Sequence, residues 1–237
     1  MSILQLQQVV KSFGKHRAVD DVSISLERGD NLAIIGESGC GKTTLAKMMM
    51  GLIAPDTGFI KVEEYSLQMV FQDPNQSLDP LWNIREILKE ALWRTTSTPG
   101  VEVTERLEKM LIAVGLSPQV LNRFPHEFSG GERQRIAIAR ALLADPKILV
   151  LDEAVSALDT LVQRQVIDLL RKLKQEFDLT YIFISHNLRL VDNFSDKIVV
   201  MYQGKIVEQG EVKTVLRSPA HPYTQQLLQA AFYKDFK

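Results

Sequence analysis

The sequence is poor in three features that would each point to a particular class of protein. Its only cysteine is Cys40, which excludes an intramolecular disulfide framework and a zinc site of several cysteines, and fits a reducing compartment. Because 28 Lys and Arg face 29 Asp and Glu, a dominant basic surface for nucleic acid is not indicated. Hydrophobic runs such as residues 148–151 fall far short of the roughly 20 residues of a membrane-crossing helix, and the N-terminus lacks the apolar core of a signal peptide. We therefore expect any role at a membrane to depend on a partner.

The composition is that of an ordinary folded protein, with 45% hydrophobic and 24% charged residues over 237 positions. Buried strands are predicted at 32–35, 148–151 and 180–184, with helices after the first two. Strands and helices that alternate in this way form parallel sheets with helices on their faces, so we predict an α/β fold with a parallel sheet. A half-exposed strand at 22–26 and a hairpin at 198–208 indicate smaller antiparallel parts.

The middle of the chain, about residues 73–144, has no strong strand signal. It is interrupted by Pro74, Pro80, Pro99 and Pro118, so we expect a mostly helical insertion there, with a polar loop at 94–100. From Ser218 the chain enters a proline-rich turn and then a short helix. The predicted organisation is one domain: a catalytic core with an antiparallel β subdomain at 1–72 and 145–217, a helical subdomain at 73–144 and a C-terminal tail at 218–237.

The sharpest motif fits the phosphate-binding loop G-x-x-x-x-G-K-[ST], at Gly36-Glu37-Ser38-Gly39-Cys40-Gly41-Lys42-Thr43. An apolar strand precedes it and a helix follows, as this loop requires. Its glycines let backbone N–H groups point inward at phosphates, and the helix N-terminus adds its positive end. We expect Lys42 to bind the β- and γ-phosphates and the Thr43 hydroxyl to bind Mg²⁺. Cys40 is interpreted as a small loop residue and not as a nucleophile.

A second motif is the apolar strand 148–151 followed by Asp152 and Glu153. The strand places both carboxylates at the carboxyl edge of the predicted sheet, beside the phosphate loop. There Asp152 could hold Mg²⁺ through water, and Glu153 could polarise an attacking water. Strands often end in acidic turns, so this motif is informative only together with the phosphate loop.

A third motif places Ser129 as the N-cap of a helix that starts with Gly130 and Gly131. Two glycines at these positions weaken a helix by about 1 kcal/mol each relative to alanine. The segment could simply be a capped helix start. This loss of helix stability is easier to understand if a second anion binds to the unpaired N–H groups at the helix N-terminus.

Together these motifs closely resemble the ATP-binding subunit of an ABC transporter, over nearly the whole chain. The resemblance implies a P-loop NTPase core with an inserted helical subdomain, and ATP and Mg²⁺ as its ligands. It also implies that two cassettes sandwich two ATP molecules. In that arrangement the signature motif, here Ser129, Gly130, Gly131 and Glu132, binds the γ-phosphate of ATP held by the other cassette.

The same resemblance assigns four residues that would each look like an ordinary loop or core residue alone. Gln72 would be the Q-loop glutamine that touches Mg²⁺ and water, and His186 the switch histidine at the γ-phosphate. Asp159 would belong to the D-loop that links the two sites, and Phe13 would stack on adenine. The implied catalytic residues are Glu153, His186, Gln72 and Lys42. The implied Mg²⁺ ligands are Thr43, Gln72 and Asp152. The implied ATP-binding residues are Phe13, Gly36, Glu37, Ser38, Gly39, Cys40, Gly41, Lys42, Thr43, Thr44, Gln72 and His186.

Finer resemblance points to one branch of the family. Residues 71–80 resemble the extended Q-loop of the oligopeptide, dipeptide and nickel importers, and residues 218–224 resemble that branch's C-terminal His-Pro-Tyr motif. Two features depart from the family pattern. The signature motif usually ends in Gln, whereas Glu132 would either repel the nucleotide slightly or pair with a nearby Arg. The segment between Gly58 and Gln72 is short for the family, so we expect a trimmed antiparallel subdomain.

The resemblance therefore predicts an ATPase that drives import of a peptide, nickel or a similar small solute through membrane-spanning permease subunits. Its other implied partners are a second cassette, identical or paralogous, and indirectly an extracytoplasmic solute-binding protein; no nucleic acid partner is expected. The chain would lie peripherally on the cytoplasmic face of the inner membrane. A permease helix is expected to dock between Gln72 and Trp93, where Leu81 and Trp82 are exposed candidates.

Two other functions compete with this prediction. A soluble ABC-type ATPase acting on DNA or ribosomes would carry long coiled coils, zinc modules or tandem cassettes, whereas this sequence has one phosphate loop, one cysteine and no sustained heptads. A regulatory cassette with weak hydrolysis is left open by Glu132, while Glu153 and His186 argue against it.

Overall fold

The computed structural model describes residues 2–63, 67–92 and 101–232, and the chain divides into two compact units. Unit 1 consists of Met1–Tyr65 and Thr180–Lys237, and unit 2 is Ser66–Leu179. The division falls at other points than the predicted domain limits, which remain predictions. Among the described residues, none of the helices combines the length and apolar character that a membrane crossing needs.

Unit 1 contains a three-stranded antiparallel sheet of β1 (Ser2–Phe13), β2 (His16–Glu27) and β4 (Thr57–Val62), in the order β2-β1-β4. The alternation predicted at 22–26 is confirmed, because Val22, Ile24 and Leu26 are buried and the residues between them are exposed. Strand β1 was not predicted. The alternation of buried and exposed residues in β1 breaks at Gln8, which has a positive φ of 48°. At this point the pairing register of β1 shifts relative to both β2 and β4.

Unit 1 also contains four neighbouring strands in the order β7-β3-β8-β9. Strands β3 (Asn31–Ile35), β7 (Thr180–Ile184) and β8 (Lys197–Tyr202) run parallel, and β9 (Lys205–Glu211) returns antiparallel to β8. All five residues of β3 and of β7 are buried, as expected for strands covered on both faces. The predicted parallel strands and the 198–208 hairpin are therefore confirmed within this unit.

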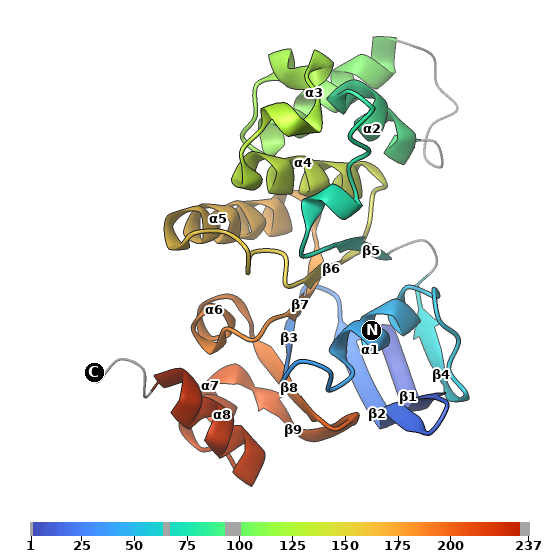
Figure 1. Ribbon diagram of the computed structural model, residues 1–237, viewed down its shortest axis with the longest axis vertical. Coiled ribbons are helices and arrows are strands. Elements are labelled where there is room, and N and C mark those ends of the chain that lie inside the picture. Colours follow the sequence, from blue (N-terminus) through green and yellow to red (C-terminus); the bar gives the residue numbers. More distant parts are fainter. Residues whose placement is uncertain (1, 64–66, 93–100, 233–237) are drawn as a thin grey trace. The chain divides into compact units, whose positions relative to one another are not determined.

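The helices of unit 1 are α1 (Lys42–Met49), α6 (Leu188–Phe194), α7 (Val212–Arg217) and α8 (Pro222–Phe232). Helix α1 begins directly after the predicted phosphate loop, as expected. Helices α7 and α8, red in Figure 1, lie beside the β8–β9 hairpin. The short C-terminal helix predicted after Ser218 is thus present as α8.

Unit 2 pairs β5 (Leu67–Val70) in parallel with β6 (Ile148–Asp152) and is otherwise helical. Its helices are α2 (Ile84–Ala91), α3 (Val101–Ala113), α4 (Gly130–Leu143) and α5 (Thr160–Phe177), with short 3₁₀ turns η1 (Pro74–Gln76), η3 (Pro118–Asn122) and η4 (Pro125–Glu127). The described residues between 73 and 144 contain no strand, which confirms the predicted helical insertion. The predicted loop at 94–100 and Trp93 lie outside the described residues.

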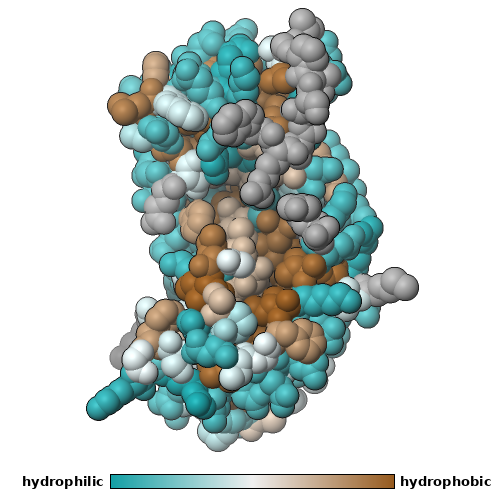
Figure 2. All heavy atoms as spheres, turned by 90° about the vertical axis from the view of Figure 1, so that its right-hand side faces the viewer, coloured by the Kyte–Doolittle hydropathy of each residue, from teal (hydrophilic) through white to brown (hydrophobic). Residues whose placement is uncertain are grey.

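Each unit also carries large hydrophobic side chains at its surface. Leu52 and Phe59 are exposed in unit 1, and Leu81 and Trp82 in unit 2. Figure 2 shows one face of the molecule, on which hydrophobic side chains gather among hydrophilic ones. Such apolar surface is common at sites where another protein docks.

Candidate active site

The predicted phosphate loop connects β3 to α1. At two of its positions the backbone of a neighbouring strand comes so close that only glycine fits. Gly36 has a φ of 148°, and Gly41, the N-cap of α1, has a φ of 109°. A Cβ atom at Gly41 would collide with the carbonyl oxygen of Ala18 on β2, and one at Gly36 would collide with that of Met201 on β8. The two neighbouring strands therefore fix the path of the loop, and only glycine fits there.

Lys42 is buried although it is charged, and its ammonium group lies inside the loop. Its Nζ donates to the carbonyl oxygens of Gly36 and Glu37, each at 2.8 Å, and lies 3.7 Å from the Sγ atom of Cys40. A positive charge surrounded by loop backbone at the start of a helix suits the binding of an anion with several oxygens, such as a phosphate chain. The loop residues therefore fit the ligand that the sequence predicts.

A pocket of about 460 Å³ opens beside this loop. It is lined by His16 and Arg17 of β2, by Glu37 through Cys40 of the loop, and by Tyr202 and Gln203 at the end of β8. Its volume lies in the range of small-molecule sites, about 300–1,000 Å³. Phe13 stands at the β1–β2 turn with 51% of its surface exposed, and the Lys11 ammonium lies 5.8 Å from its ring centre. An exposed ring can stack on a base, but the adenine role of Phe13 remains a prediction.

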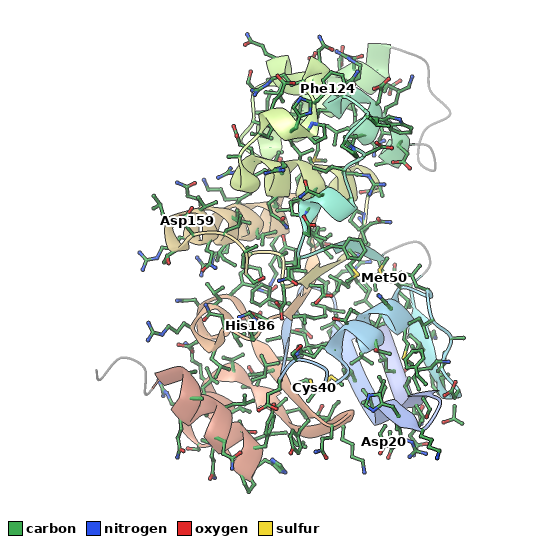
Figure 3. All side chains as sticks on the ribbon, viewed as in Figure 1. Asp20, Cys40, Met50, Phe124, Asp159 and His186 are labelled. Atoms are coloured by element: carbon green, nitrogen blue, oxygen red, sulfur yellow. The ribbon has the colours of Figure 1, made fainter. Side chains whose placement is uncertain are left out.

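His186 follows β7, the strand next to β3. Ile34 of β3 pairs with Ile184 of β7, so the phosphate loop and His186 leave the sheet at the same edge, where ligands of open α/β sheets bind. His186 is exposed, and Figure 3 labels it together with Cys40 of the loop. Next to it, Asn187 caps α6 by accepting from the amides of Arg189 and Leu190. Unit 1 thus brings together the phosphate loop and the predicted switch histidine.

Unit 2 holds the other catalytic candidates at one edge of its own strand pair. Val70 of β5 pairs with Leu151 of β6. Gln72 lies two residues after Val70, and Glu153 lies two residues after Leu151. Asp152, the last residue of β6, is buried, and Gln72 is exposed. The predicted metal and water ligands Gln72, Asp152 and Glu153 are therefore neighbours at the carboxyl end of two parallel strands.

The backbone of Glu153 is strained. Its φ is 49°, a left-handed conformation that costs a residue other than glycine roughly 1–2 kcal/mol. The turn after it holds this conformation, since both the amide and the hydroxyl of Ser156 donate to the Glu153 carbonyl, at 2.9 and 2.8 Å. Strain that surrounding structure maintains is frequent at functional sites, but residues such as Asp145 and Asp178 share a positive φ, so the role of Glu153 remains a prediction.

Ser129 is the N-cap of α4, as predicted, but the structure adds a partner that the sequence interpretation missed. The Ser129 Oγ accepts from the Glu132 amide, while the Glu132 carboxylate accepts from the Ser129 amide at 2.9 Å and from its hydroxyl at 2.7 Å. These hydrogen bonds, first that from the Ser129 hydroxyl, lower the pKa of Glu132. Glu132 therefore completes a capping box, for which the S-x-x-E spacing was the available signal.

The two glycines after Ser129 also have a packing role. A Cβ atom at Gly131 would lie 2.6 Å from Cγ1 of Val162 on α5, whereas one at Gly130 would make an ordinary 3.6 Å contact with Leu158. Close helix packing therefore accounts for Gly131 without any ligand. Asp159 has a local role too: its carboxylate caps α5 by accepting from the amides of Leu161 and Val162, each at 3.0 Å. The nucleotide roles of Ser129, Gly130, Gly131, Glu132 and Asp159 remain predictions.

Comparison with known proteins defines the class. The family model described as "ABC transporter" matches residues 19–156, more than half of the chain. The chain therefore belongs to the ABC transporter family, and it is an ATP-binding cassette whose ATP hydrolysis is coupled to transport.

Among curated proteins, the chain is 44% identical over 254 residues to the oligopeptide transport ATP-binding protein AppF of Bacillus subtilis, covering 96% of this chain and 77% of AppF. It is 43% identical over 229 residues to the dipeptide transport ATP-binding protein DppF of Escherichia coli, covering 90% of this chain and 69% of DppF. Among solved structures it resembles the ADP conformation of MJ1267, an ATP-binding cassette of an ABC transporter. That match has a TM-score of 0.79 and 30% identity and covers 96% of this chain and 98% of MJ1267. The predicted P-loop NTPase fold is thereby confirmed.

Proposed function

We propose that this chain binds MgATP on its phosphate loop and hydrolyses it to energise the import of peptides through membrane-spanning permease subunits. The observation that carries the proposal is the buried Lys42 ammonium, held among loop carbonyls at the start of α1. The peptide cargo is supported by the relatives AppF and DppF, which are an oligopeptide and a dipeptide transport ATP-binding protein. Nickel or another small solute is less well supported, since the relatives reported above are peptide transport proteins.

The assigned roles follow from the chemistry of each side chain. Lys42 binds the β- and γ-phosphates, and the exposed N–H groups of the loop bind the remaining phosphate oxygens. Glu153 orients and polarises the attacking water, with Gln72 and His186 at the transferring phosphoryl group. Phe13 stacks on adenine. The roles combine residues of both units, and their support is the order of the motifs along the chain and their match to the family.

The residues also fit a bound Mg²⁺. This ion prefers oxygen ligands, retains several waters and is usually held by one or two carboxylates together with substrate phosphates. Asp152, Gln72 and the Thr43 hydroxyl supply oxygen ligands of this kind. When bound, the ion would neutralise charge on the phosphates.

A second cassette and the permease complete the proposed assembly. The solved cassette MJ0796 is described as dimeric and bound to ADP and phosphate; it matches this chain with a TM-score of 0.76 and 26% identity, over 88% of this chain and 98% of that one. We infer a similar dimer here, in which Ser129, Gly130, Gly131 and Glu132 face the nucleotide of the partner and Asp159 links the two sites. The permease would dock at Leu81 and Trp82, which are 82% and 41% exposed. An extracytoplasmic binding protein would act indirectly, and the chain would lie on the cytoplasmic face of the inner membrane.

The test is ATP turnover by the purified chain with Mg²⁺, for the parent and for Glu153→Gln, with the oligomeric state followed by light scattering. Removing a general base typically lowers the rate about 10²–10⁴-fold, so Glu153→Gln should bind ATP, turn over at least about 100-fold more slowly and accumulate as an ATP-bound dimer. Glu176→Gln is the matched control, because Glu176 is an exposed carboxylate on α5. Parental turnover in Glu153→Gln would contradict the role of Glu153, and absence of ATP binding by the parent would overturn the proposed function.

A further inference from the structure

The C-terminal His-Pro-Tyr segment reaches the phosphate loop through one hydrogen bond. The hydroxyl oxygen of Tyr223, in the first turn of α8, accepts from the backbone amide of Glu37 at 2.9 Å. The Tyr223 side chain is only 6% exposed, and its ring packs on Tyr202 with 4.2 Å between ring centres. All of these residues belong to unit 1. A motif without an assigned role in nucleotide binding therefore touches the loop that binds the phosphates.

The turn before α8 fixes the position of Tyr223. The Glu208 carboxylate on β9 accepts from the amides of Ala220 and His221, at 2.8 and 3.0 Å. Burial opposes the ionisation of Glu208, but the hydrogen bonds it accepts outweigh this effect and lower its pKa. The Nδ1 atom of His221 in turn accepts from the Tyr223 amide at 3.2 Å. The start of α8 is thus tied to the β8–β9 hairpin on one side and to the phosphate loop on the other.

The peptide group that Tyr223 contacts also contacts Lys42. The Glu37 amide and the Gly36 carbonyl belong to the same planar peptide group. Its N–H donates to the Tyr223 hydroxyl at 2.9 Å, and its C=O accepts from the Lys42 ammonium at 2.8 Å. Since the group is planar, fixing the direction of the N–H also fixes the direction of the carbonyl. Hydrogen bonds at both ends of one peptide group also polarise and strengthen one another.

We propose that Tyr223 is a positioning residue of the nucleotide site, which orients the Gly36–Glu37 peptide group and through it the Lys42 ammonium that binds the phosphates. This inference rests on the proposed function, because it gives the His-Pro-Tyr segment a role in that same site. The Tyr223 hydroxyl is neutral, since burial raises the pKa of the phenol further above its ordinary value of 10.0. Its aromatic ring, packed against Tyr202, holds the oxygen in place with few rotatable bonds.

The first experiment compares Tyr223→Phe with the parent by amide hydrogen exchange in the nucleotide-free chain. The substitution keeps the ring and its packing on Tyr202, so the fold should be retained, while the Glu37 amide loses its acceptor. We expect the Glu37 amide to exchange at least about fivefold faster in the variant. Equal exchange rates in the two proteins would overturn the proposal whatever the nucleotide measurements show.

The second experiment measures ATP binding in a double-mutant cycle of Tyr223→Phe and Lys42→Ala. Leaving the part-buried Glu37 amide without its acceptor should raise the Kd for ATP about three- to tenfold in Tyr223→Phe alone. If Tyr223 acts through Lys42, the same substitution should change the Kd less than about twofold when Lys42 is already alanine. The positioning role would be overturned if the two substitutions lowered the affinity for ATP independently of each other. It would also be overturned if Tyr223→Phe had the Kd of the parent.

Gln225→Ala serves as the matched control. Gln225 also lies on α8, and its side-chain amide donates to the Pro219 carbonyl at 3.0 Å, away from the loop. Losing that bond loosens the same segment without affecting the Glu37 amide, so both Glu37 exchange and the Kd for ATP should stay parental. If Gln225→Ala raised the Kd as much as Tyr223→Phe, the effect would be a general loosening and the proposal would fail. A parent that binds no ATP would contradict the proposed function, whereas a parental Kd in Tyr223→Phe would contradict only the role of Tyr223.

Discussion

Ser129 and Glu132 together form the capping box at the N-terminus of α4. Each side chain accepts from the other residue's backbone amide, and a further hydrogen bond joins the two side chains at 2.7 Å. The carboxylate expected to repel a nucleotide or to pair with an Arg is therefore engaged within its own helix turn, with Arg123 and Arg135 near enough to favour its negative charge. Glu132 is therefore compatible with an intact helix α4.

The capping box predicts how substitutions at Glu132 affect stability. Glu132→Ala removes one half of the box and should lower the free energy of unfolding by about 0.5–1.5 kcal/mol. Glu132→Gln keeps an oxygen that can accept from the Ser129 amide but loses the charge, so at neutral pH it should lose less unfolding free energy than Glu132→Ala does. Urea unfolding of the three proteins measures both values. Equal losses in Glu132→Ala and Glu132→Gln would show that the charge, and not the hydrogen bond, matters.

The lowered pKa of Glu132 gives a pH dependence with a defined sign. A carboxyl group whose pKa is lower in the folded than in the unfolded chain stabilises the fold above its unfolded pKa, here near the ordinary value of 4.5. This contribution is lost as the pH falls through the lower, folded pKa. The stability of the parent relative to Glu132→Gln should therefore decrease as the pH is lowered from neutral to below 4.5. A stability difference that is independent of pH in this window would contradict the assignment.

Two glycines of the phosphate loop should differ sharply in their tolerance of alanine. Gly39→Ala meets no atom within 4 Å and suffers only the strain of a φ of 81°, about 1–2 kcal/mol. Gly41→Ala has a φ of 109° and in addition collides with the backbone of Ala18, so it should lose more than about 3 kcal/mol of unfolding free energy. Urea unfolding without nucleotide separates the two. Similar losses would mean that β2 does not confine the loop as described.

The exposed residues Leu81 and Trp82, which follow η1, should matter for assembly with the permease and not for the stability of the fold. Leu81→Glu should leave the free energy of unfolding within about 0.5 kcal/mol of the parent, because Leu81 is 82% exposed. It should also reduce co-purification with the permease subunits and the stimulation of turnover by them. Ile112→Glu is the control, since Ile112 on α3 is a 61% exposed hydrophobic residue outside the predicted docking segment. Equal effects of both substitutions on assembly would contradict docking at Leu81.

Local sequence patterns were sufficient for most of the fold. The apolar runs predict β3, β6 and β7, because strands buried on both faces are hydrophobic at nearly every position. The spacing of apolar residues predicts α5, and the Gln203-Gly204 turn predicts the β8–β9 hairpin. Strands β1 and β4 were less visible, because a register shift interrupts the alternation of β1 and the side chains of β4 are largely exposed.

The site was predictable only where its residues are close together in the sequence. The phosphate loop is a continuous motif, and the S-x-x-E pattern of Ser129 and Glu132 could have predicted their capping box. The contact between Tyr223 and Glu37 joins residues 186 positions apart, and no local pattern encodes it. The same holds for the approach of Val162 to Gly131 across two helices. Contacts of this kind arise from packing, which depends on the whole fold.

The arrangement of unit 1 has a consequence for the order of events during protein synthesis. Strand β3 lies between β7 and β8, so both of its parallel neighbours come from the second segment of the unit. A growing chain therefore produces all of unit 2 while β3 still lacks both neighbours, and since domains generally fold as they emerge, unit 2 can fold first. The Glu37 amide of the phosphate loop gains its hydrogen bond to the Tyr223 hydroxyl only when Tyr223 has been added. A nascent cassette should thus become able to hold nucleotide firmly only after the segment that carries Tyr223 has been synthesised.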